Sequence, residues 1–334
     1  MRKTCAIITI FLFLIITILF CLYLDLQSYA NQPAAVETGE KVVMVLPGQG
    51  FKAFAQRLHQ EGIIDHPDKF ALLARLKGQD KIIKAGEYKF SSTMPPGTIL
   101  SILVSGKVRL YKFTVPEGYN LKQIASLAAR SGYATDTDFF KVATDAALAH
   151  SMGIEAETFE GYLFPDTYHF PKGSSPEMII SAMVKRFWAV FEPEWKMRAK
   201  TLRLSVHQVV TLASLIEKET GAAFERPLIA SVFHNRLKRR MRLETDPTVI
   251  YGLKDYNGNL TRKHLSMPTP YNTYTISGLP PGPIASTGID AIKAALYPAD
   301  TQFLYFVSKK DGTHQFSTNF KDHNRAVQKY QLRR

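Results

Sequence analysis

Hydrophobic and polar positions divide the chain into one long apolar run and two regions of short mixed elements. Residues 5–24 carry no charged side chain, whereas apolar residues after Asp25 recur at helix or strand spacing. A helix of about 20 residues spans about 30 Å, the thickness of the hydrocarbon core of a bilayer. The pattern therefore predicts a transmembrane helix at 5–24, a cytoplasmic tip at 1–4 and a linker at 25–40.

Charges beside the apolar run indicate its orientation. Arg2 and Lys3 precede it and Asp25 follows it, so the positive-inside rule places the N-terminus in the cytoplasm and the rest of the chain outside. A signal peptide cleaved after Ala30 is the alternative, but its apolar core is long for that role. In both cases the part of the chain after Asp25 is exported. Nucleic acid is therefore not expected as the binding partner that the net charge of +13 would otherwise suggest.

The region 41–107 follows the order strand, helix, helix, strand. Its predicted elements are a strand at 42–46, helices at 51–58 and from 66 onward, a strand at 81–90 and a short helix at 98–104. This order resembles a LysM-like carbohydrate-binding module. A generic small α+β domain is the alternative that the pattern leaves open.

The region 108–334 is predicted to be a larger α+β domain. Strands are expected at 108–115, 304–307 and 314–317, with a hairpin turn at Asp311-Gly312. Helices are expected at 121–129, after Ser175 and at 319–331. The chain as a whole is therefore assigned to the α+β class, with an N-terminal transmembrane helix, a small LysM-like module and a larger α+β domain, which is expected to be the catalytic one.

One helix carries two carboxylates at the end of an apolar stripe. Ser205 and Gln208 have the spacing of a capping box, and Gly221 supplies a stop signal. Glu217 and Glu219 lie two residues apart, hence about 200° apart around the helix, and cannot share a face. The two glutamates therefore meet different surroundings.

Glu219 has the larger apolar neighbours. It falls between Leu212 and Leu215 on the helical surface, where partial burial raises the pKa of a carboxyl group and keeps it protonated near neutral pH. A general acid acting on a glycosidic oxygen needs this property. The alternative is a solvated helix end in which Glu217, Lys218 and Glu219 do no chemistry.

Several long motifs then resemble those of the MltG (YceG-like) family of lytic transglycosylases, in the same order along the chain. They are the stretches at 160–168 (EGYLFPDTY), 212–220 (LASLIEKET), 230–237 (ASVFHNRL), 241–252 (MRLETDPTVIYG), 271–274 (YNTY) and 278–285 (GLPPGPIA). The resemblance extends from the apolar run to near the end of the chain. By alignment, the catalytic glutamate of the family corresponds to Glu219, with Glu217 as the alternative.

The resemblance implies cleavage within peptidoglycan glycan strands, between MurNAc and GlcNAc, leaving a 1,6-anhydro-MurNAc end. One carboxyl group suffices, because the C6 hydroxyl of the same sugar is the nucleophile, unlike in hydrolases with two carboxylates. The resemblance also implies termination of nascent strands, contact with cell-wall synthases and a location in the bacterial inner membrane. No cofactor is implied.

Other candidate residues lie in the family motifs. Asp246 is the nearest rival carboxylate and is also expected as a turn residue in Thr245-Asp246-Pro247. Asn272 and Tyr274 are candidates for binding N-acetyl groups and sugar faces, or for holding their own loop. The basic cluster at 236–242 is expected to be a solvated face or to meet anionic lipid or stem-peptide carboxylates.

The remaining residues restrict the chemistry. The two cysteines, Cys5 and Cys21, both lie in the apolar run, so no zinc site built on cysteine is expected, and the histidines lack metal-binding spacing. The alternative function of a different class is a non-catalytic glycan-binding scaffold of the cell-wall machinery. A muramidase hydrolase is a further alternative, separated by whether the new end is anhydro or reducing.

Overall fold

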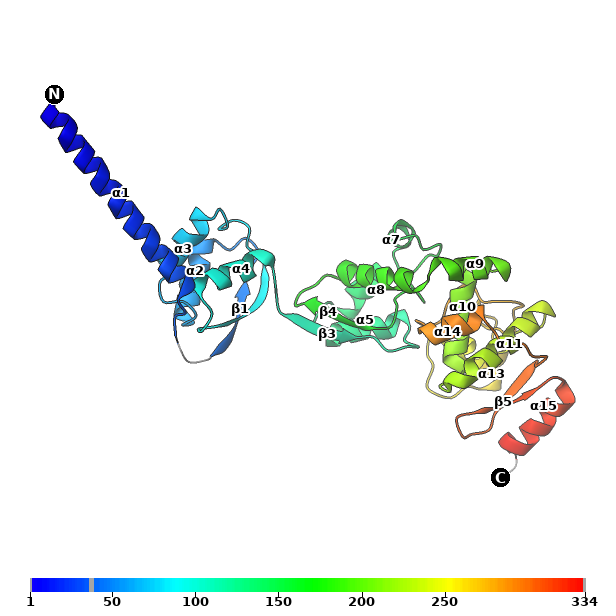
Figure 1. The fold of residues 1–334 in the computed structure, drawn as a ribbon. Helices are drawn as coiled ribbons and strands as arrows, with labels where there is room; N and C mark the ends of the chain where they lie inside the picture. Colours follow the sequence, from blue (N-terminus) through cyan, green and yellow to red (C-terminus); the bar gives the residue numbers. More distant parts are fainter. Residues whose placement is uncertain (1, 36–38, 333–334) are drawn as a thin grey trace. The chain divides into compact units, whose positions relative to one another are not determined.

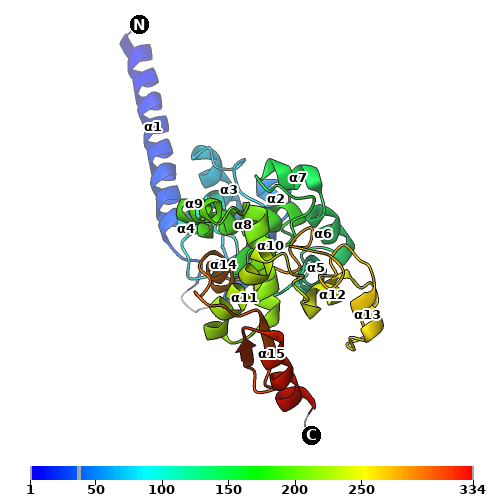
Figure 2. The same ribbon diagram turned by 90° about the vertical axis from the view of Figure 1, so that its right-hand side faces the viewer.

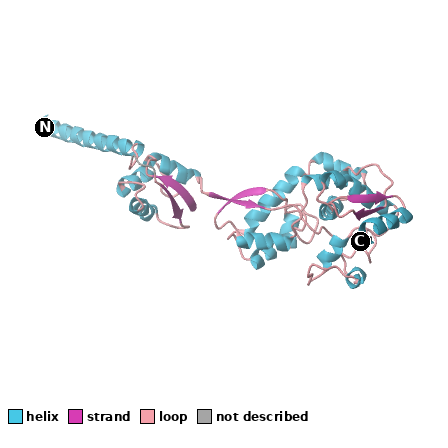
Figure 3. Cartoon of the chain, turned by 90° about the horizontal axis from the view of Figure 1, so that it is seen from below, coloured by secondary structure: helices cyan, strands magenta, loops and turns pink. Residues whose placement is uncertain are grey.

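The computed structural model describes residues 2–35 and 39–332, and the chain forms two compact units (Figure 1). Unit 1 comprises Met1–Tyr111 and His169–Lys172, and unit 2 comprises Lys112–Tyr168 and Gly173–Arg334. The predicted domain boundary at 107/108 thus lies a few residues before the end of the first segment of unit 1. The prediction also did not include residues 169–172, which belong to unit 1 although they come much later in the sequence. The α+β class is confirmed, with short strand pairs among many helices (Figure 3).

The first helix, α1 (Arg2–Asn31), is longer than the predicted transmembrane segment. Its apolar side chains from Ile7 to Leu24 are exposed, and the stretch Ile7–Asn31 is long and apolar enough to cross a membrane. Its last turns differ: Leu26, Tyr29 and Ala30 are buried in the core of unit 1.

The predicted linker at 25–40 is therefore wrong over its first part. Leu26, Tyr29 and Ala30 have the spacing of one helical face, and they find apolar partners against α3 (Pro67–Leu76) and α4 (Pro96–Ser105), so the helix continues. Asp25 also forms an ion pair with Lys69 of α3 at 2.7 Å. Residues 36–38 of the predicted linker lie outside the described residues.

The small module of unit 1 has the predicted strand, helix, helix, strand order. Its elements are β1 (Glu40–Val45), α2 (Phe51–Gln60), α3 and β2 (Gly86–Ser91), followed by α4. β1 and β2 are antiparallel, with Glu40 opposite Ser91 and Val45 opposite Gly86. The second strand begins later than the predicted residue 81.

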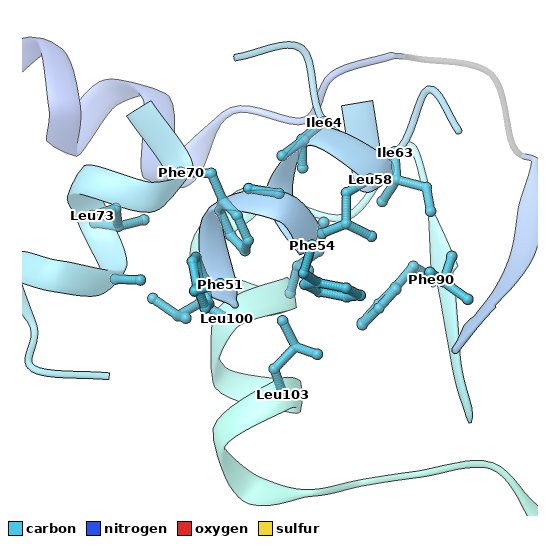
Figure 4. Packing of buried hydrophobic residues seen from close by; sticks show 14 of the residues in the cluster. Phe51, Phe54, Leu58, Ile63, Ile64, Phe70, Leu73, Phe90, Leu100 and Leu103 are labelled. Atoms are coloured by element: carbon cyan, nitrogen blue, oxygen red, sulfur yellow. The ribbon is translucent and has the colours of Figure 1, made fainter. Parts of the chain in front are cut away.

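Aromatic and aliphatic side chains from α2, α3, α4 and β2 meet in the core of unit 1 (Figure 4). Phe51 and Phe70 stack with ring centroids 5.3 Å apart, and Phe54 and Leu58 of the same helix face are fully buried. Phe51, Phe54 and Leu58 are the positions that the helical periodicity places inward. Burial of such side chains stabilises a small domain by about 1.5–3 kcal/mol each.

Unit 2 is mainly helical. Strands β3 (Leu110–Thr114) and β4 (Thr167–Pro171) each have residues in both units. The other elements of unit 2 are, in order, α5 (Leu121–Arg130), α6 (Asp136–Ala143), α7 (Ala146–Ser151), α8 (Pro176–Val190), α9 (Pro193–Thr201), α10 (Val206–Glu219), a 3-10 turn (Ala223–Glu225), α11 (Arg226–Lys238), α12 (Asp246–Gly252), α13 (Arg262–Ser266), α14 (Ile289–Leu296), β5 (Tyr305–Ser308), β6 (His314–Ser317), α15 (Phe320–Val327) and a final π-helical turn (Gln328–Leu332).

Helix α10 lies at the centre of this unit. It contacts α9, α11, α12 and α14, and Figure 2 shows α11 and α14 beside it. The predicted hairpin near the C-terminus is confirmed, because β5 and β6 pair antiparallel across the turn at Asp311-Gly312. Strands β3 and β4, in contrast, come from distant parts of the sequence.

Candidate active site

Helix α10 carries Glu217 and Glu219 in its last turn, inside unit 2. Its start is the predicted capping box: the Gln208 amide donates to Ser205 Oγ at 3.1 Å, and the Ser205 amide donates to Gln208 Oε1 at 2.9 Å. Every residue of 209–216 is buried, which fixes the helix on most of its circumference. The last residues, 217–219, therefore emerge from a rigid support, which suits a group that must be positioned accurately.

Glu219 is half-buried and holds a defined hydrogen bond. The Thr245 hydroxyl donates to Glu219 Oε1. Burial, with a smaller contribution from the nearby Asp246 carboxylate, raises the pKa of Glu219 to about 7, although the Thr245 hydrogen bond and the Arg236 charge both lower it. A substantial fraction of Glu219 is therefore protonated near neutral pH, as a general acid requires.

Glu217 is held by a different set of contacts. Its Oε1 accepts from Arg226 Nη2 and its Oε2 from the Gly288 amide, both at 3.0 Å. The Glu217 side chain is only 6% exposed, and Glu117 and Asp290 each lie 3.6 Å from the same Arg226 guanidinium. Both oxygens of Glu217 are thus occupied by neighbouring chain segments, whereas Glu219 has one hydroxyl partner.

Asp246 lies beside Glu219, but the predicted turn at Thr245-Asp246-Pro247 is wrong. Asp246 is the first residue of α12, because Pro247 fits the first turn of a helix, where its missing N–H is not needed. The Asp246 side chain accepts a 2.7 Å hydrogen bond from the Tyr274 hydroxyl. Burial and this carboxylate both raise the pKa of Tyr274, which keeps its phenol a donor.

Asn272 is fully buried, and its side-chain amide holds its own loop. Nδ2 donates to the carbonyl groups of His264, Leu265 and Met267 at 3.3, 3.0 and 2.7 Å, and Oδ1 accepts from the Tyr274 amide at 2.9 Å. These contacts favour the loop-holding alternative for Asn272. They also place Tyr274 next to Asp246, so the predicted candidates Glu219, Asp246 and Tyr274 are brought together.

Sequence comparisons agree with this assembly of motifs. The sequence pattern of the YceG-like family matches residues 43–329. The chain belongs to the YceG-like family.

Two relatives of the chain are both named endolytic murein transglycosylase. It is 34% identical to the endolytic murein transglycosylase of Bacillus subtilis (strain 168), over 90% of this chain and 87% of that protein. It is 30% identical to the protein of the same name from Streptococcus pneumoniae serotype 2, over 88% of this chain and 59% of that longer protein. The crystal structure of a putative yceG-like protein from Listeria monocytogenes is similar, with 33% identity and a TM-score of 0.60 over 86% of this chain and 98% of that one. The family resemblance inferred from the motifs is confirmed.

Threonines of this YceG-like chain form a network behind Glu219 that the sequence reasoning missed. The Thr245 amide donates to Thr273 Oγ1 at 3.0 Å, and the Thr248 and Thr273 hydroxyls are 2.8 Å apart. All three residues are buried, so the Thr245 hydroxyl that reaches Glu219 has a fixed position. Thr245 and Thr273 stand inside the quoted motifs, but periodicity alone does not show where a hydroxyl points.

The prediction that Arg236 belongs to a solvated basic face is wrong, because its side chain is buried. It is 7% exposed and donates to the carbonyl groups of Leu304 at 2.7 Å, Leu243 at 3.0 Å and Arg242 at 3.1 Å. A guanidinium has five donors and fits such a set of carbonyl groups. It anchors the segment that leads to Thr245, while 238–240 of the predicted face are more open to solvent.

Two cavities adjoin the α10–α12 region of this family member. The larger, about 640 Å³, is bordered by Lys218, Pro247, Tyr251 and Glu160, and the second, about 590 Å³, by Glu160, His207 and Tyr271. Within residues 7–35 and 39–332, no group of three or more His, Cys, Asp or Glu side chains is placed to hold a metal ion.

Proposed function

We propose that this chain is an endolytic peptidoglycan lytic transglycosylase, an enzyme of the lyase class, in which Glu219 is the single acid–base catalyst. The observation that supports this most directly is the carboxyl group of Glu219, which is half-buried, fixed by Thr245 and has its pKa raised to about 7. The family and the names of its relatives supply the substrate class.

In the first half-reaction, protonated Glu219 donates its proton to the glycosidic oxygen. The bond between that oxygen and C1 of MurNAc breaks, and the GlcNAc leaving group departs with a free hydroxyl. Glu219 is left as a carboxylate, to which the Thr245 hydroxyl donates a hydrogen bond. General acid catalysis of this kind contributes about 10²–10⁴-fold.

In the second half-reaction, the Glu219 carboxylate takes the proton of the C6 hydroxyl. The C6 oxygen attacks C1 of the same sugar, which closes the 1,6-anhydro ring and restores protonated Glu219. No water is consumed. The nucleophile and the reacting carbon belong to one sugar, so a high effective concentration supplies much of the rate advantage.

Asp246 and Tyr274 are proposed to border the sugar-binding site. The Asp246 carboxylate disfavours the ionised form of Glu219 and so supports its role as an acid. The Tyr274 hydroxyl keeps Asp246 in place, and its ring offers an aromatic face of the kind found in sugar clefts. Asn272 acts indirectly, by holding the loop that carries Tyr274.

The module 41–107 is proposed to be a LysM-like unit that binds glycan. Its strand, helix, helix, strand order supports this assignment. The exposed apolar stretch of α1 is proposed to be an uncleaved single-pass anchor in the bacterial inner membrane, with the body outside the cytoplasm. Recovery of a mature protein that starts at Asn31 from the soluble periplasmic fraction would contradict this.

Termination of nascent strands next to cell-wall synthases is proposed as the physiological role, because an endolytic cut without water releases a strand and leaves a closed end. A non-catalytic scaffold is the second candidate. The pairing of Glu219 with Thr245 argues against a scaffold, since glycan binding alone does not need a carboxyl group with a raised pKa.

The test is product analysis on purified sacculi, with Glu219→Gln and Glu217→Gln as a matched pair. The wild type should release 1,6-anhydro-muropeptides, and Glu219→Gln should lose about 10²–10⁴-fold of this activity with little change in Tm. Glu217→Gln should keep substantial activity per folded molecule, because its carboxylate faces Arg226 and not Thr245.

Other outcomes identify what is wrong. If Glu217→Gln is inactive and Glu219→Gln is active, the acid is Glu217. If both remain active, Asp246 becomes the candidate. Reducing ends in place of anhydro ends would indicate a hydrolase, and absence of any cleavage by the wild type would favour the scaffold.

A further inference from the structure

Glu160 is a buried carboxyl group that the proposed reaction does not use. It is 5% exposed, and its Oε2 accepts hydrogen bonds from the Leu121 amide at 3.2 Å and from the Tyr251 hydroxyl at 2.9 Å. Oε1 is buried without a hydrogen-bond partner in the described part of the chain. A buried polar atom left unpaired is unfavourable, so its presence calls for an explanation such as a ligand.

The protonation state of Glu160 indicates the kind of partner that Oε1 lacks. Burial raises the pKa of Glu160 to about 7, although the Leu121 amide, the Tyr251 hydroxyl and the Gly161 amide all lower it. Two donors already occupy Oε2, so the proton of the neutral acid belongs on Oε1. The missing partner is then an acceptor, such as a carboxylate or an amide carbonyl.

Glu160 borders the larger cavity, and the other charged residues around that cavity are basic. Lys122, Lys218 and Lys254 line it, and all three are exposed, with Lys218 Nζ also donating to the Gly118 carbonyl at 3.2 Å. Among the described residues, no aspartate lines this cavity. A wall with three lysines and one acid that is neutral below its pKa complements an anionic ligand.

The cavity and Glu219 share two helices. Lys218 precedes Glu219 on α10, and α12 runs from Asp246, beside Glu219, to Tyr251 at the cavity wall. Five residues of helix correspond to about 7.5 Å. The cavity wall at Tyr251 therefore lies within about 7.5 Å, along α12, of the residue beside Glu219.

We propose that the cavity bounded by Glu160, Tyr251 and Lys218 binds an acidic peptide, namely the peptide stem of the glycan substrate, through its lysines and the Glu160 carboxyl group. This rests on the proposed function for the identity of the substrate, but it concerns a binding site apart from Glu219. The site would make the enzyme prefer glycan that carries stems with free carboxylates over peptide-free glycan.

The first experiment measures binding of a synthetic stem peptide with free carboxylates to the full chain in detergent. The Glu219→Gln background is used throughout, so the result does not depend on whether Glu219 is the acid. Lys122→Glu and Lys254→Glu should each raise Kd at least about fivefold, and added salt should weaken wild-type binding. Lys200→Glu, at an exposed lysine on α9 outside the cavity, is the matched control and should leave Kd within about twofold.

The second experiment uses pH to test Glu160 itself. Peptide binding should weaken as pH rises from 6 to 8, because Glu160 then ionises, and Glu160→Gln should remove this dependence. Other charged or titratable groups line the two cavities with Glu160. In the first they are Lys122, Lys218, Lys254, Tyr251 and Tyr256. In the second they are His150, Glu155, Glu157, His207 and Tyr271. A pH dependence that persists in Glu160→Gln would point to a histidine and overturn the role of Glu160.

A third measurement compares substrates on the active enzyme. Lys122→Glu should lower the ratio of kcat/KM for stem-bearing glycan to that for peptide-free glycan. An equal loss on both substrates would show that the cavity binds sugar, and no stem-peptide binding by the wild-type cavity would reject the proposal. If Glu219→Gln loses cleavage but still binds the stem peptide, the result supports both the catalytic role of Glu219 and the stem-peptide site at the cavity, each by its own measurement.

Discussion

The cores of the two units differ in what they bury. Unit 1 buries aromatic and aliphatic side chains, with Glu87 and Ser91 as its buried polar residues among those described. Unit 2 buries a set of threonines, serines and charged residues around α10, among them Thr245, Arg226 and Arg236. Because burial of polar groups is unfavourable unless they are paired, the second arrangement needs a specific network, and that network surrounds the two glutamates.

The comparison shows why two carboxyl groups on one helix behave differently. In Glu217, an ion pair with Arg226 and a backbone amide satisfy both oxygens. For Glu219, the Thr245 hydroxyl opposes only part of the effect of burial on the pKa, so the pKa of this carboxyl group rises to about 7. A fully paired carboxylate stabilises the fold, whereas an incompletely paired one retains a proton that can be transferred.

The largest expected effect of breaking a core is in unit 1. Phe54→Ala removes a fully buried ring and should destabilise this module by about 3–5 kcal/mol. Binding to purified sacculi should weaken, while cleavage of soluble glycan fragments should change little if the module only holds glycan. Thermal unfolding and sacculus pull-down measure the two effects. Unchanged sacculus binding by an unfolded module would contradict the LysM-like proposal.

A smaller loss of stability is expected in the polar core. Glu217→Gln removes a buried charge opposite Arg226 but leaves Glu117 and Asp290 at 3.6 Å, so the free energy of unfolding should fall by about 1–3 kcal/mol. Glu219→Gln is the matched control, since a neutral amide replaces a largely protonated acid. Chemical denaturation of both variants at pH 6 measures the difference. Equal losses would remove the distinction between the two glutamates.

Thr245→Val should sharpen the comparison by removing only the hydroxyl partner of Glu219. Valine keeps the shape of threonine, so we expect about a 10-fold loss of kcat with KM nearly unchanged, typical of a positioning hydrogen bond worth about 1.4 kcal/mol. Release of anhydro-muropeptides at several substrate concentrations separates the two constants. A rise in KM alone would mean that Thr245 serves substrate binding.

The smallest effect is on the pH profile. Glu219 must be protonated for the first half-reaction, so activity should decline as pH rises through about 7. The Thr245 hydrogen bond lowers this pKa, and its removal in Thr245→Val should shift the alkaline limb to higher pH by less than about one unit. A limb that does not move would show that another group controls it.

Much of the local structure follows from the sequence because it depends on neighbouring residues. The capping box of Ser205 and Gln208, the inward face of Phe54 and Leu58, and the hairpin at Asp311-Gly312 are encoded within a few positions. The motifs likewise predicted the family. The end of α1 was missed because its polar and small residues resemble a linker, although Leu26 and Tyr29 find apolar partners in the fold.

The tertiary structure alone decided the environments of the charged groups. Thr245 reaches Glu219 across 26 positions, and Tyr251 reaches Glu160 across 91. Arg236, expected in solvent, is buried because carbonyl groups of distant segments converge on its guanidinium. Helical spacing fixes the direction in which a side chain leaves its own backbone, but burial and hydrogen bonding, which set its pKa, depend on segments that only folding brings near.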